Sequence, residues 1–340
     1  MITILETSAL NTVQDLGRPG YRNLGVGTSG VMDPIALRAG NILLGNQDDD
    51  ACIELQTYPF VLRFDTAGSF AVTGIDAEIE LDGRAILPWM VETAAAGQVL
   101  RVGPPRQGAR GYICIAGGID VPAVLGSRST QLRGGFGGLD GRPLEAGDTL
   151  RSGGIALDVA GYGALPPTVA LDTATDRDDA RLIHLRAMPA TDYTLFTPEA
   201  QERLWHVHWR ITPQSNRVGY RLSGEPLTLR HKVELRSYGV VAGIVQVPPA
   251  GEPIVQLADA NTVGGYPRIA TVIEADLWHL AQARIGTRIQ FHECSFEQGV
   301  AAMQPVNAYL DDLRMMAAHY RSSAHRRAGG RTGAKSGDKA

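Results

Sequence analysis

Polar side chains that could bind a ligand gather in two glycine-rich passages more than 200 residues apart in the sequence. The first passage covers residues 12–34 and the second covers residues 246–267, and each carries an amide and an acid beside its glycines. These amides and acids are Gln14, Asp15, Gln246 and Asp259. Glycines let backbone N–H groups approach a ligand closely, while polar side chains orient it. The composition therefore predicts a ligand site built by loops from two distant parts of the chain.

The acids also have structural interpretations, which the sequence leaves open. Asp33 stands before Pro34, as is typical of a helix start, where a carboxylate caps free N–H groups. The same helix start can bind an anion, with Ser29 as a further donor. Asp259 can close a loop, or it can act as a general base, a metal ligand or an acceptor from a substrate N–H.

Two segments of the first half carry further candidate contacts. Gln14, Asp15 and Arg18 can line a site, or they can form a turn network that needs no ligand. Residues 126–130 read Gly-Ser-Arg-Ser-Thr and offer donors for carboxylate or phosphate oxygens, or else form a capped turn. The candidate contacts in this segment are Ser127, Arg128 and Thr130.

The second half contains the strongest cationic segment, with Arg217 and Arg221 four positions apart. Either guanidinium can neutralise a carboxylate or phosphate, and we expect Arg221 to be the structural one. His206 and His208 would share one face if residues 205–211 formed a strand. A metal site needs a third ligand nearby, so we predict structural roles for both histidines and no metal site.

Composition and motifs exclude several classes of protein. The 340 residues carry a net charge of −4, which argues against binding nucleic acid or an anionic membrane. The sequence has no Gly-x-x-x-x-Gly-Lys-Ser/Thr loop and no Met-Lys-Met motif, so we predict no P-loop and no covalently attached biotin. Three widely spaced cysteines, no signal-peptide pattern and no long apolar run predict a soluble cytoplasmic protein.

The chain contains 40 glycines and many short alternating segments, which predict a mainly β protein with few helices. A hairpin is expected at residues 77–87, with a type I′ turn at Asp82 and Gly83. Further strands are expected at residues 111–116, 155–159, 181–185, 240–247 and 288–291. Helices are expected at residues 34–44, 198–204 and 274–281 and at the C-terminus.

A polar segment near the middle divides the chain into two β-rich halves. The expected parts are a first lobe at 1–165, a linker at 166–180, a second lobe at 181–294, a C-terminal helix at 295–320 and a disordered tail at 321–340.

Five short motifs, taken in order, resemble those of a known family. They lie at residues 14–18, 29–33, 126–130, 216–222 and 264–267. The chain resembles the 5-oxoprolinase C-subunit family over roughly residues 2–291. That family is also called allophanate hydrolase subunit 2 and is related to part of the carboxyltransferase domain of urea carboxylase. The resemblance implies two cyclophilin-like β-barrel lobes and one component of an ATP-dependent 5-oxoprolinase, a hydrolase that opens the lactam of 5-oxoproline to glutamate.

The resemblance, taken together with the two glycine-rich passages, suggests roles for individual residues. A lactam is a poor electrophile, so ATP together with Mg²⁺ would activate its carbonyl oxygen by phosphorylation. We expect Arg217 to neutralise phosphate or carboxylate charge, and Asp259 and Gln246 to orient the amide. The residues expected to line the substrate site are Gln14, Asp15, Arg18, Ser29, Asp33, Ser127, Arg128, Thr130, Thr262, Gly264, Gly265 and Tyr266.

Partner proteins are implied by the resemblance as well. The 5-oxoprolinase B-subunit-like protein is expected to bind this chain directly, and an A-subunit-like protein is expected to complete the hydrolysis. The chain alone is therefore expected to be inactive. The sequence departs from the family pattern at Val218, Tyr238 and Asn261. Met is common at the first of these positions, an acid at the second, and Gln or another polar residue at the third. Of these changes, Tyr238 bears most on the identity of the small-molecule amide substrate.

Two alternative functions remain open at this point. The chain can be a carboxyltransferase component that acts on carboxybiotin carried by another protein, in urea or allophanate metabolism. It can also be a non-enzymatic regulator that binds a B-subunit-like kinase inhibitor.

Overall fold

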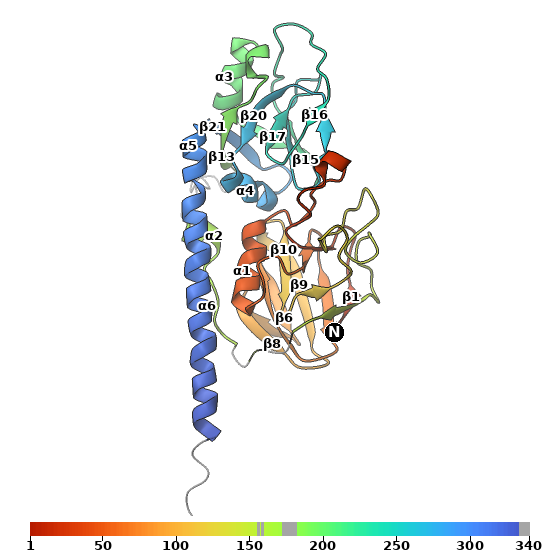
Figure 1. Ribbon diagram of the computed structural model, residues 1–340, viewed down its shortest axis with the longest axis vertical. Coiled ribbons are helices and arrows are strands. Elements are labelled where there is room, and N and C mark those ends of the chain that lie inside the picture. The colour runs from red at the N-terminus through yellow and green to blue at the C-terminus, as the bar shows by residue number, and fades with distance from the viewer. Residues whose placement is uncertain (155–156, 158–159, 172–181, 333–340) are drawn as a thin grey trace, which may run out of the picture.

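Two lobes lie end to end in the computed structural model, with a long C-terminal helix beside them (Figure 1). The structure describes residues 1–154, 157, 160–171 and 182–332. Strands β1–β12 belong to the first lobe and strands β13–β21 to the second. The predicted mainly β architecture with few helices and a C-terminal helix is confirmed. The strand expected at residues 155–159 and most of the expected linker lie outside the described residues.

The first lobe packs a seven-stranded sheet against a five-stranded sheet, with orders β11-β12-β1-β4-β9-β6-β7 and β2-β3-β10-β5-β8. The strands are β1 Ile2–Glu6, β2 Thr12–Gln14, β3 Cys52–Leu55, β4 Phe60–Phe64, β5 Gly68–Thr73, β6 Asp76–Leu81, β7 Arg84–Ile86, β8 Val91–Ala94, β9 Val99–Gln107, β10 Gly111–Ile115, β11 Ile119–Asp120 and β12 Thr149–Ser152. Alternate apolar residues from both sheets, such as Ile4 and Val72, form the core between them.

The hairpin formed by β6 and β7 is confirmed together with its turn type. Asp82 and Gly83 adopt φ values of 50° and 75°, and a type I′ turn requires positive φ at both positions. The turn matches the right-handed twist of the flanking strands and sets their register, with Leu81 opposite Arg84.

Helix α1, Pro34–Leu44, covers the outer face of the five-stranded sheet and has the predicted bounds. Asp33 caps its start, and Gly45, at φ 76°, ends it in the left-handed conformation. Gly40 lets the helix approach β10 closely, because a Cβ there would lie 2.5 Å from the Cys114 sulfur.

The second lobe is a closed barrel of seven strands in the order β13-β20-β17-β18-β15-β14-β21, with β16 and β19 paired outside it. The strands are β13 Leu182–Pro189, β14 Trp209–Ile211, β15 Gly219–Ser223, β16 Tyr238–Gly239, β17 Ile244–Gln246, β18 Ile254–Gln256, β19 Val263–Gly264, β20 Arg268–Val272 and β21 Arg288–Glu293. Helices α3, Pro198–His206, and α4, Leu277–Gln282, pack against a core that includes Trp209 and Phe291.

One strand prediction in this lobe is wrong, and the condition under which His206 and His208 would share a strand face is not met. No strand covers residues 205–211, because α3 continues to His206 and β14 begins only at Trp209. Residues 240–247 contribute only β17, since Gly243, at φ 91°, turns the chain immediately before it. The helix expected at 274–281 begins instead with a 3-10 turn, Glu274–Asp276.

The predicted C-terminal helix is present as α5, Phe296–Ala301, and α6, Met303–Thr332. Helix α6 continues past residue 320, where the disordered tail was expected to begin, so that boundary is wrong. One physical reason is that Arg321 Nη1 donates to the Ile42 carbonyl at 2.9 Å, which satisfies an acceptor at the end of α1. Residues 333–340 lie outside the described residues. A short helix, α2 Pro167–Ala170, lies within the expected linker.

Candidate functional site

Arg217 lies at the junction of the lobes, in the turn between β14 and β15, and its guanidinium bonds to both lobes. Its Nε donates to Asp259 Oδ2 at 2.8 Å within the second lobe, and its Nη2 donates to the Gly30 carbonyl of the first lobe at 2.5 Å. Its Nη1 pairs with Glu54 of β3, which is fully buried. Burial disfavours the charge, but Glu54 and Asp259 outweigh burial and raise the pKa of Arg217. Arg217, rather than Arg221, therefore holds the structural ion pairs, and Arg221 is exposed.

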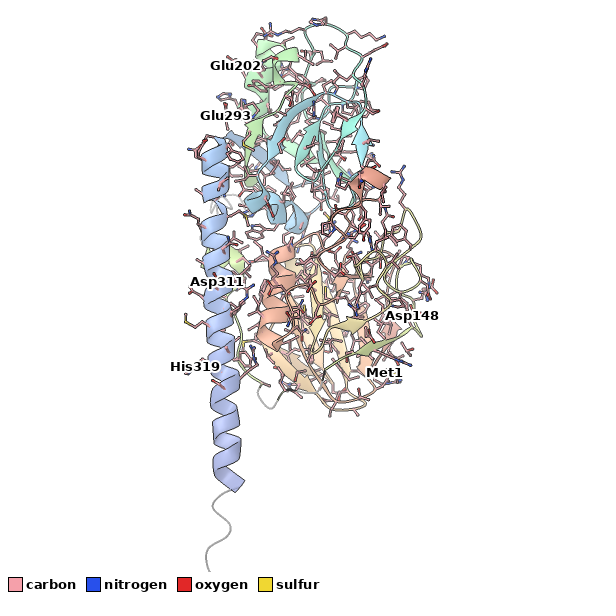
Figure 2. All side chains as sticks on the ribbon, in the orientation of Figure 1. Met1, Asp148, Glu202, Glu293, Asp311 and His319 are labelled. Carbon is pink, nitrogen blue, oxygen red and sulfur yellow. The ribbon has the colours of Figure 1, made fainter. Side chains whose placement is uncertain are left out.

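A cleft with a volume of about 640 Å³ opens between the lobes. Arg217 and Asp259 are the two predicted site residues that line it. The wall of the cleft also includes Gln56, Arg110, Arg133, Ser215, Tyr220 and Arg284. Figure 2 shows side chains from both lobes in the region where the lobes meet. The cleft is within the size range of small-molecule sites, which favour such junctions.

Asp15 is buried in the first lobe, and protein donors occupy its carboxylate. It accepts from the Gly17 N–H at 2.7 Å, the Ser127 hydroxyl at 2.6 Å, the Ser129 hydroxyl at 2.5 Å and the Arg128 N–H at 2.5 Å. The segment at 126–130 thus folds onto the first glycine-rich passage. Asp15 thus connects the two motifs through a buried network of hydrogen bonds. This arrangement agrees with the alternative in which these residues form a turn network that needs no ligand.

Three neighbouring predicted residues are buried with polar atoms that have no hydrogen-bond partner among the described residues. These atoms are Gln14 Oε1, Arg18 Nη1 and Ser29 Oγ. Gln14 Nε2 donates to the Thr130 carbonyl at 3.1 Å, and Arg18 Nη2 donates to the Ser129 carbonyl. Burial lowers the pKa of Arg18. A buried polar group without a partner is costly, so these atoms mark a place where a water or ligand group would be stabilising.

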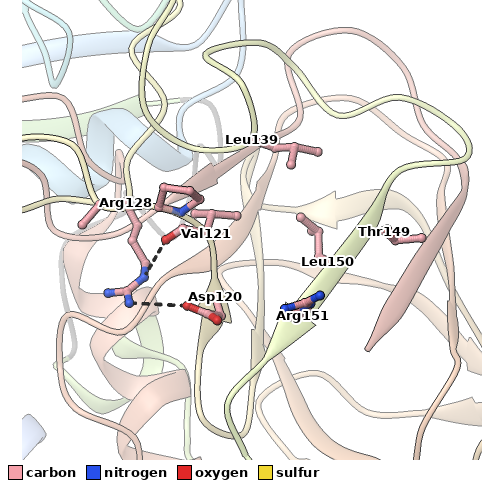
Figure 3. Close-up of a pocket in the computed structure, with 9 residues that line it drawn as sticks. Asp120, Val121, Arg128, Leu139, Thr149, Leu150 and Arg151 are labelled. Carbon is pink, nitrogen blue, oxygen red and sulfur yellow. Dashed lines mark hydrogen bonds and ion pairs between the residues drawn. The ribbon is translucent and has the colours of Figure 1, made fainter.

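Arg128 points away from the lobe junction. Its Nη2 lies 3.6 Å from Asp120 Oδ1, and its Nε donates to the Val121 carbonyl at 3.1 Å (Figure 3). These residues line a separate hollow of about 480 Å³ on the first lobe. The structure therefore does not bring the Arg128 side chain together with Arg217 and Asp259.

Asp33 is the helix cap that the sequence predicted, and it also contacts the second lobe. Its Oδ1 accepts from the N–H groups of Ile35 at 3.1 Å and Ala36 at 3.0 Å, while its Oδ2 accepts from Gln282 Nε2 at 2.8 Å. Burial is the main cause that raises the pKa of Asp33 to about 6, against the lowering effect of these hydrogen bonds.

The second glycine-rich passage forms a polar cluster around Gln246 in the barrel lobe. Gln246 Oε1 accepts from Gln256 Nε2 at 3.0 Å, and Gln246 Nε2 donates to the Tyr238 hydroxyl at 3.0 Å. That hydroxyl donates in turn to the Tyr266 carbonyl. A Cβ at Gly264 would lie 2.7 Å from Gln246 Nε2, so the glycine leaves room for this amide. Tyr238, the departure from the family pattern, is thus a central partner of Gln246.

The remaining predicted residues of this passage are nearer the surface. The Thr262 carbonyl accepts from the Val240 N–H at 3.0 Å, which continues the pairing of β16 with β19. Gly265 and the Tyr266 side chain are exposed. Gln246, Thr262, Gly264, Gly265 and Tyr266 are not among the residues that line the interlobe cleft.

Sequence reasoning missed Glu54, Arg110, Tyr220 and Gln282, which all lie at the lobe junction. Two of them carried a signal in the sequence, since Glu54 is a lone acid within the apolar strand β3 and Tyr220 lies within the motif at residues 216–222. His206 belongs to α3, and His208 contacts Gln290 at 3.2 Å. In the described part of the chain, no three His, Cys, Asp or Glu side chains come together as a metal site. No helix of that part is long and apolar enough to span a membrane.

Comparisons with known proteins agree with this architecture. The family model described as carboxyltransferase domain, subdomain A and B, matches residues 24–293. The chain is 39% identical to the C subunit of 5-oxoprolinase from Haemophilus influenzae, over 92% of this chain and 98% of that protein. It is 40% identical to the C subunit of 5-oxoprolinase from Escherichia coli, over 92% of this chain and 97% of that protein.

Larger proteins share the fold as well. The structure of Kluyveromyces lactis urea amidolyase superposes with a TM-score of 0.84 at 29% identity, over 92% of this chain and 20% of that protein. This chain therefore spans about a fifth of the length of that enzyme. The chain belongs to the carboxyltransferase subdomain A and B family. Within that family, it is similar over nearly its whole length to proteins named as the C subunit of 5-oxoprolinase.

Proposed function

We propose that this chain is one subunit of an ATP-dependent 5-oxoprolinase, a hydrolase that opens the lactam of 5-oxoproline to glutamate. The observation that carries the proposal is the near-full-length similarity, at 39% and 40% identity, to two proteins named as the C subunit of 5-oxoprolinase. The interlobe cleft supports it, since it is sized for a small molecule and is lined by Arg217 and Asp259.

The proposed chemistry needs an acceptor for the ring N–H and cationic groups for developing negative charge. ATP, with Mg²⁺ bound to its phosphates, is the second substrate and transfers its γ-phosphoryl group to the lactam oxygen, with ADP as the leaving group. Water then adds to the activated carbon, phosphate leaves, and the ring C–N bond breaks to give glutamate. Asp259 Oδ1 makes only a 3.4 Å contact with Arg217, and we assign this oxygen to the substrate N–H. The unpartnered atoms of Gln14, Arg18 and Ser29 are further candidates for substrate contact, and Gln246 stays a predicted one.

The proposed enzyme is a hetero-oligomer in the cytoplasm. A B-subunit-like protein is the direct partner and an A-subunit-like protein completes the hydrolysis, so this chain alone is inactive. Both full-length relatives are named as subunits, which supports partners in general. Three free cysteines, two of them buried, suit a reducing compartment. The chain carries no covalent biotin in this proposal.

The second candidate function is a carboxyltransferase component that uses carboxybiotin carried by another protein. Its support is 32% identity to urea amidolyase of Saccharomyces cerevisiae, of which this chain covers 18%. The lower identity and the small share of that enzyme favour the oxoprolinase. A purely regulatory role would leave partner binding intact without ATP turnover.

The test is glutamate release from 5-oxoproline and ATP by the purified chain, with and without its co-purified B-subunit-like and A-subunit-like proteins. We expect release only when all components are present. No release from a verified, intact complex would refute the proposal. Carboxylation of urea with a biotinylated donor protein would then identify the second candidate, and binding without turnover of either substrate would identify the regulator.

A further inference from the structure

Arg110 is a buried arginine of the interlobe cleft whose hydrogen-bond partners are all neutral. It lies just before β10, is 6% exposed and lines the cleft. Its Nη1 donates to the Tyr220 hydroxyl at 2.7 Å and the Ala281 carbonyl at 2.6 Å, and its Nη2 lies 3.3 Å from Gln56 Oε1. Its Nε has no partner among the described residues. Burial disfavours the charge, but Tyr220 and Glu54 act through space and raise the pKa of Arg110, so the cation persists.

Arg110 leaves its Nε–Nη2 edge largely without partners, and three other arginines of this protein bind carboxylates through that same edge. In three arginine–aspartate pairs, Nε donates to one carboxylate oxygen and Nη2 contacts the other, with Nε distances of 2.8–3.0 Å. The pairs are Arg186–Asp276, Arg217–Asp259 and Arg268–Asp192. Two parallel N–H groups match the two oxygens of a carboxylate, which makes this contact strong and specific. At Arg110 only the long contact with Gln56 occupies that edge.

The rest of the cleft wall also favours an anion. Arg284 donates to the carbonyls of Pro105 at 2.6 Å and Gly108 at 2.9 Å, and Arg133 contacts the amide oxygen of Asn261. All of these acceptors are neutral. Asp259, an acid of the cleft wall, is already paired with Arg217. The cleft therefore carries excess positive charge although the whole chain has a net charge of −4.

We propose that Arg110 binds the carboxylate of a small-molecule ligand through its Nε–Nη2 edge, with the Gln56 side chain moving aside. This inference rests on the proposed function, in which the ligand is 5-oxoproline. Arg110 then holds the carboxylate of the substrate, and Arg217 keeps its structural ion pairs. The neutral partners on Nη1 hold the guanidinium in place without satisfying its charge, which leaves the open edge for the ligand.

Gln56→Glu is the sharpest test, because it places a carboxylate of the protein itself against the open edge. The added ion pair keeps the fold intact and competes with the ligand. Gln214→Glu is the control, since Gln214 is exposed beside Ser215 of the cleft wall and is not a hydrogen-bond partner of Arg110, while the change adds the same charge. Binding of 5-oxoprolinate and of 2-pyrrolidinone, the same ring without a carboxylate, is measured by calorimetry on the full complex. The KM for 5-oxoproline and for ATP is measured in parallel.

We expect Gln56→Glu to raise the Kd and KM for 5-oxoprolinate at least tenfold, with the KM for ATP and the binding of 2-pyrrolidinone within twofold of the wild type. Arg110→Gln should weaken 5-oxoprolinate in the same way, and Gln214→Glu should change it less than twofold. An unchanged KM in Gln56→Glu, or an equal effect of Gln214→Glu, would overturn the site. If the Gln56→Glu complex released glutamate with an unchanged KM for 5-oxoproline, the carboxylate site at Arg110 would be ruled out while the proposed function would stand. If 5-oxoprolinate bound in an Arg110-dependent way but no glutamate were released, the proposed function would be ruled out while the site would stand.

Discussion

A single carboxylate, Asp33, shows how one residue serves a helix and a domain junction together. The cap on α1 needs an acceptor, and any of Asp, Asn, Ser or Thr would supply one. The contact with Gln282 comes from the second lobe and covers the carboxylate, which is buried as a result. Burial without a cationic partner opposes ionisation, and it raises the pKa of Asp33 to about 6.

Asp33 should therefore make the protein more stable as the pH falls. Its pKa rises from 3.8 to about 6 on folding, so the folded protein holds the proton more tightly than the unfolded chain. The favourable contribution is complete below about pH 4 and is lost as the pH rises through 6. Compared with Asp33→Asn, which does not titrate here, the wild type should gain about 2–3 kcal/mol of unfolding free energy between pH 7.5 and pH 4. Urea unfolding of both proteins at both pH values measures this gain, and a constant difference would contradict it.

The sequence could predict the cap but not the environment of the residues around it. Asp33 before Pro34 is a local pattern, and so are the glycines around Asp15 and Gln246. Arg217 was predicted to contact a ligand, yet its partners include Glu54 from a strand 163 positions away in the sequence. Arg110 lies in no motif. Its neutral partners, Tyr220 and Ala281, belong to the second lobe and lie more than 100 positions away in the sequence. Pairings of this kind follow from the docking of the lobes.

At the scale of elements, α6 is bound to the first lobe although it follows the second. Its apolar residues Val306, Leu310, Leu313 and Ala317 are buried against α1. Their spacing of three and four residues marks one face of a helix, and this periodicity was readable from the sequence. The end of the helix was not, since Arg321 reaches the carbonyls of another helix. Helix α6 thus packs along the first lobe (Figure 1).

Removing one buried side chain from this face of α6 should lower the stability of the protein. Leu310→Ala deletes a fully buried side chain and leaves a cavity, so we expect a loss of about 2–5 kcal/mol in unfolding free energy. Met315→Ala is the matched control on the same helix, because Met315 is exposed, and it should change stability by less than about 0.5 kcal/mol. Chemical denaturation of the three proteins distinguishes the two outcomes. Equal stability of both variants would mean that α6 is not docked on α1.

For the whole molecule, Glu54 and Arg217 tie the two lobes to one another. Glu54 accepts from the Met32 N–H of its own lobe at 2.7 Å and from the Arg217 guanidinium of the other. A buried ion pair is weak evidence of net stabilisation, since desolvation offsets the attraction. It is strong evidence of mutual dependence, because either charge left alone would be buried without its partner. The cleft that holds Arg110 and Asp259 exists only while the lobes stay docked in this way.

Glu54→Ala should therefore destabilise the protein far more than the loss of an exposed acid does. We expect the unfolding free energy to fall by about 3–5 kcal/mol, because Arg217 keeps Asp259 but loses its buried partner in the first lobe. Glu6→Ala is the control, since Glu6 pairs with Arg101 at the surface of the same lobe, and it should cost about 1 kcal/mol or less. Adding Arg217→Ala to Glu54→Ala should cost less than the sum of the single changes, because the second change removes the buried charge that has lost its partner in the first lobe. Urea denaturation with probes in both lobes measures all three effects. Strict additivity of the two changes would show that the lobes fold and dock without help from this pair.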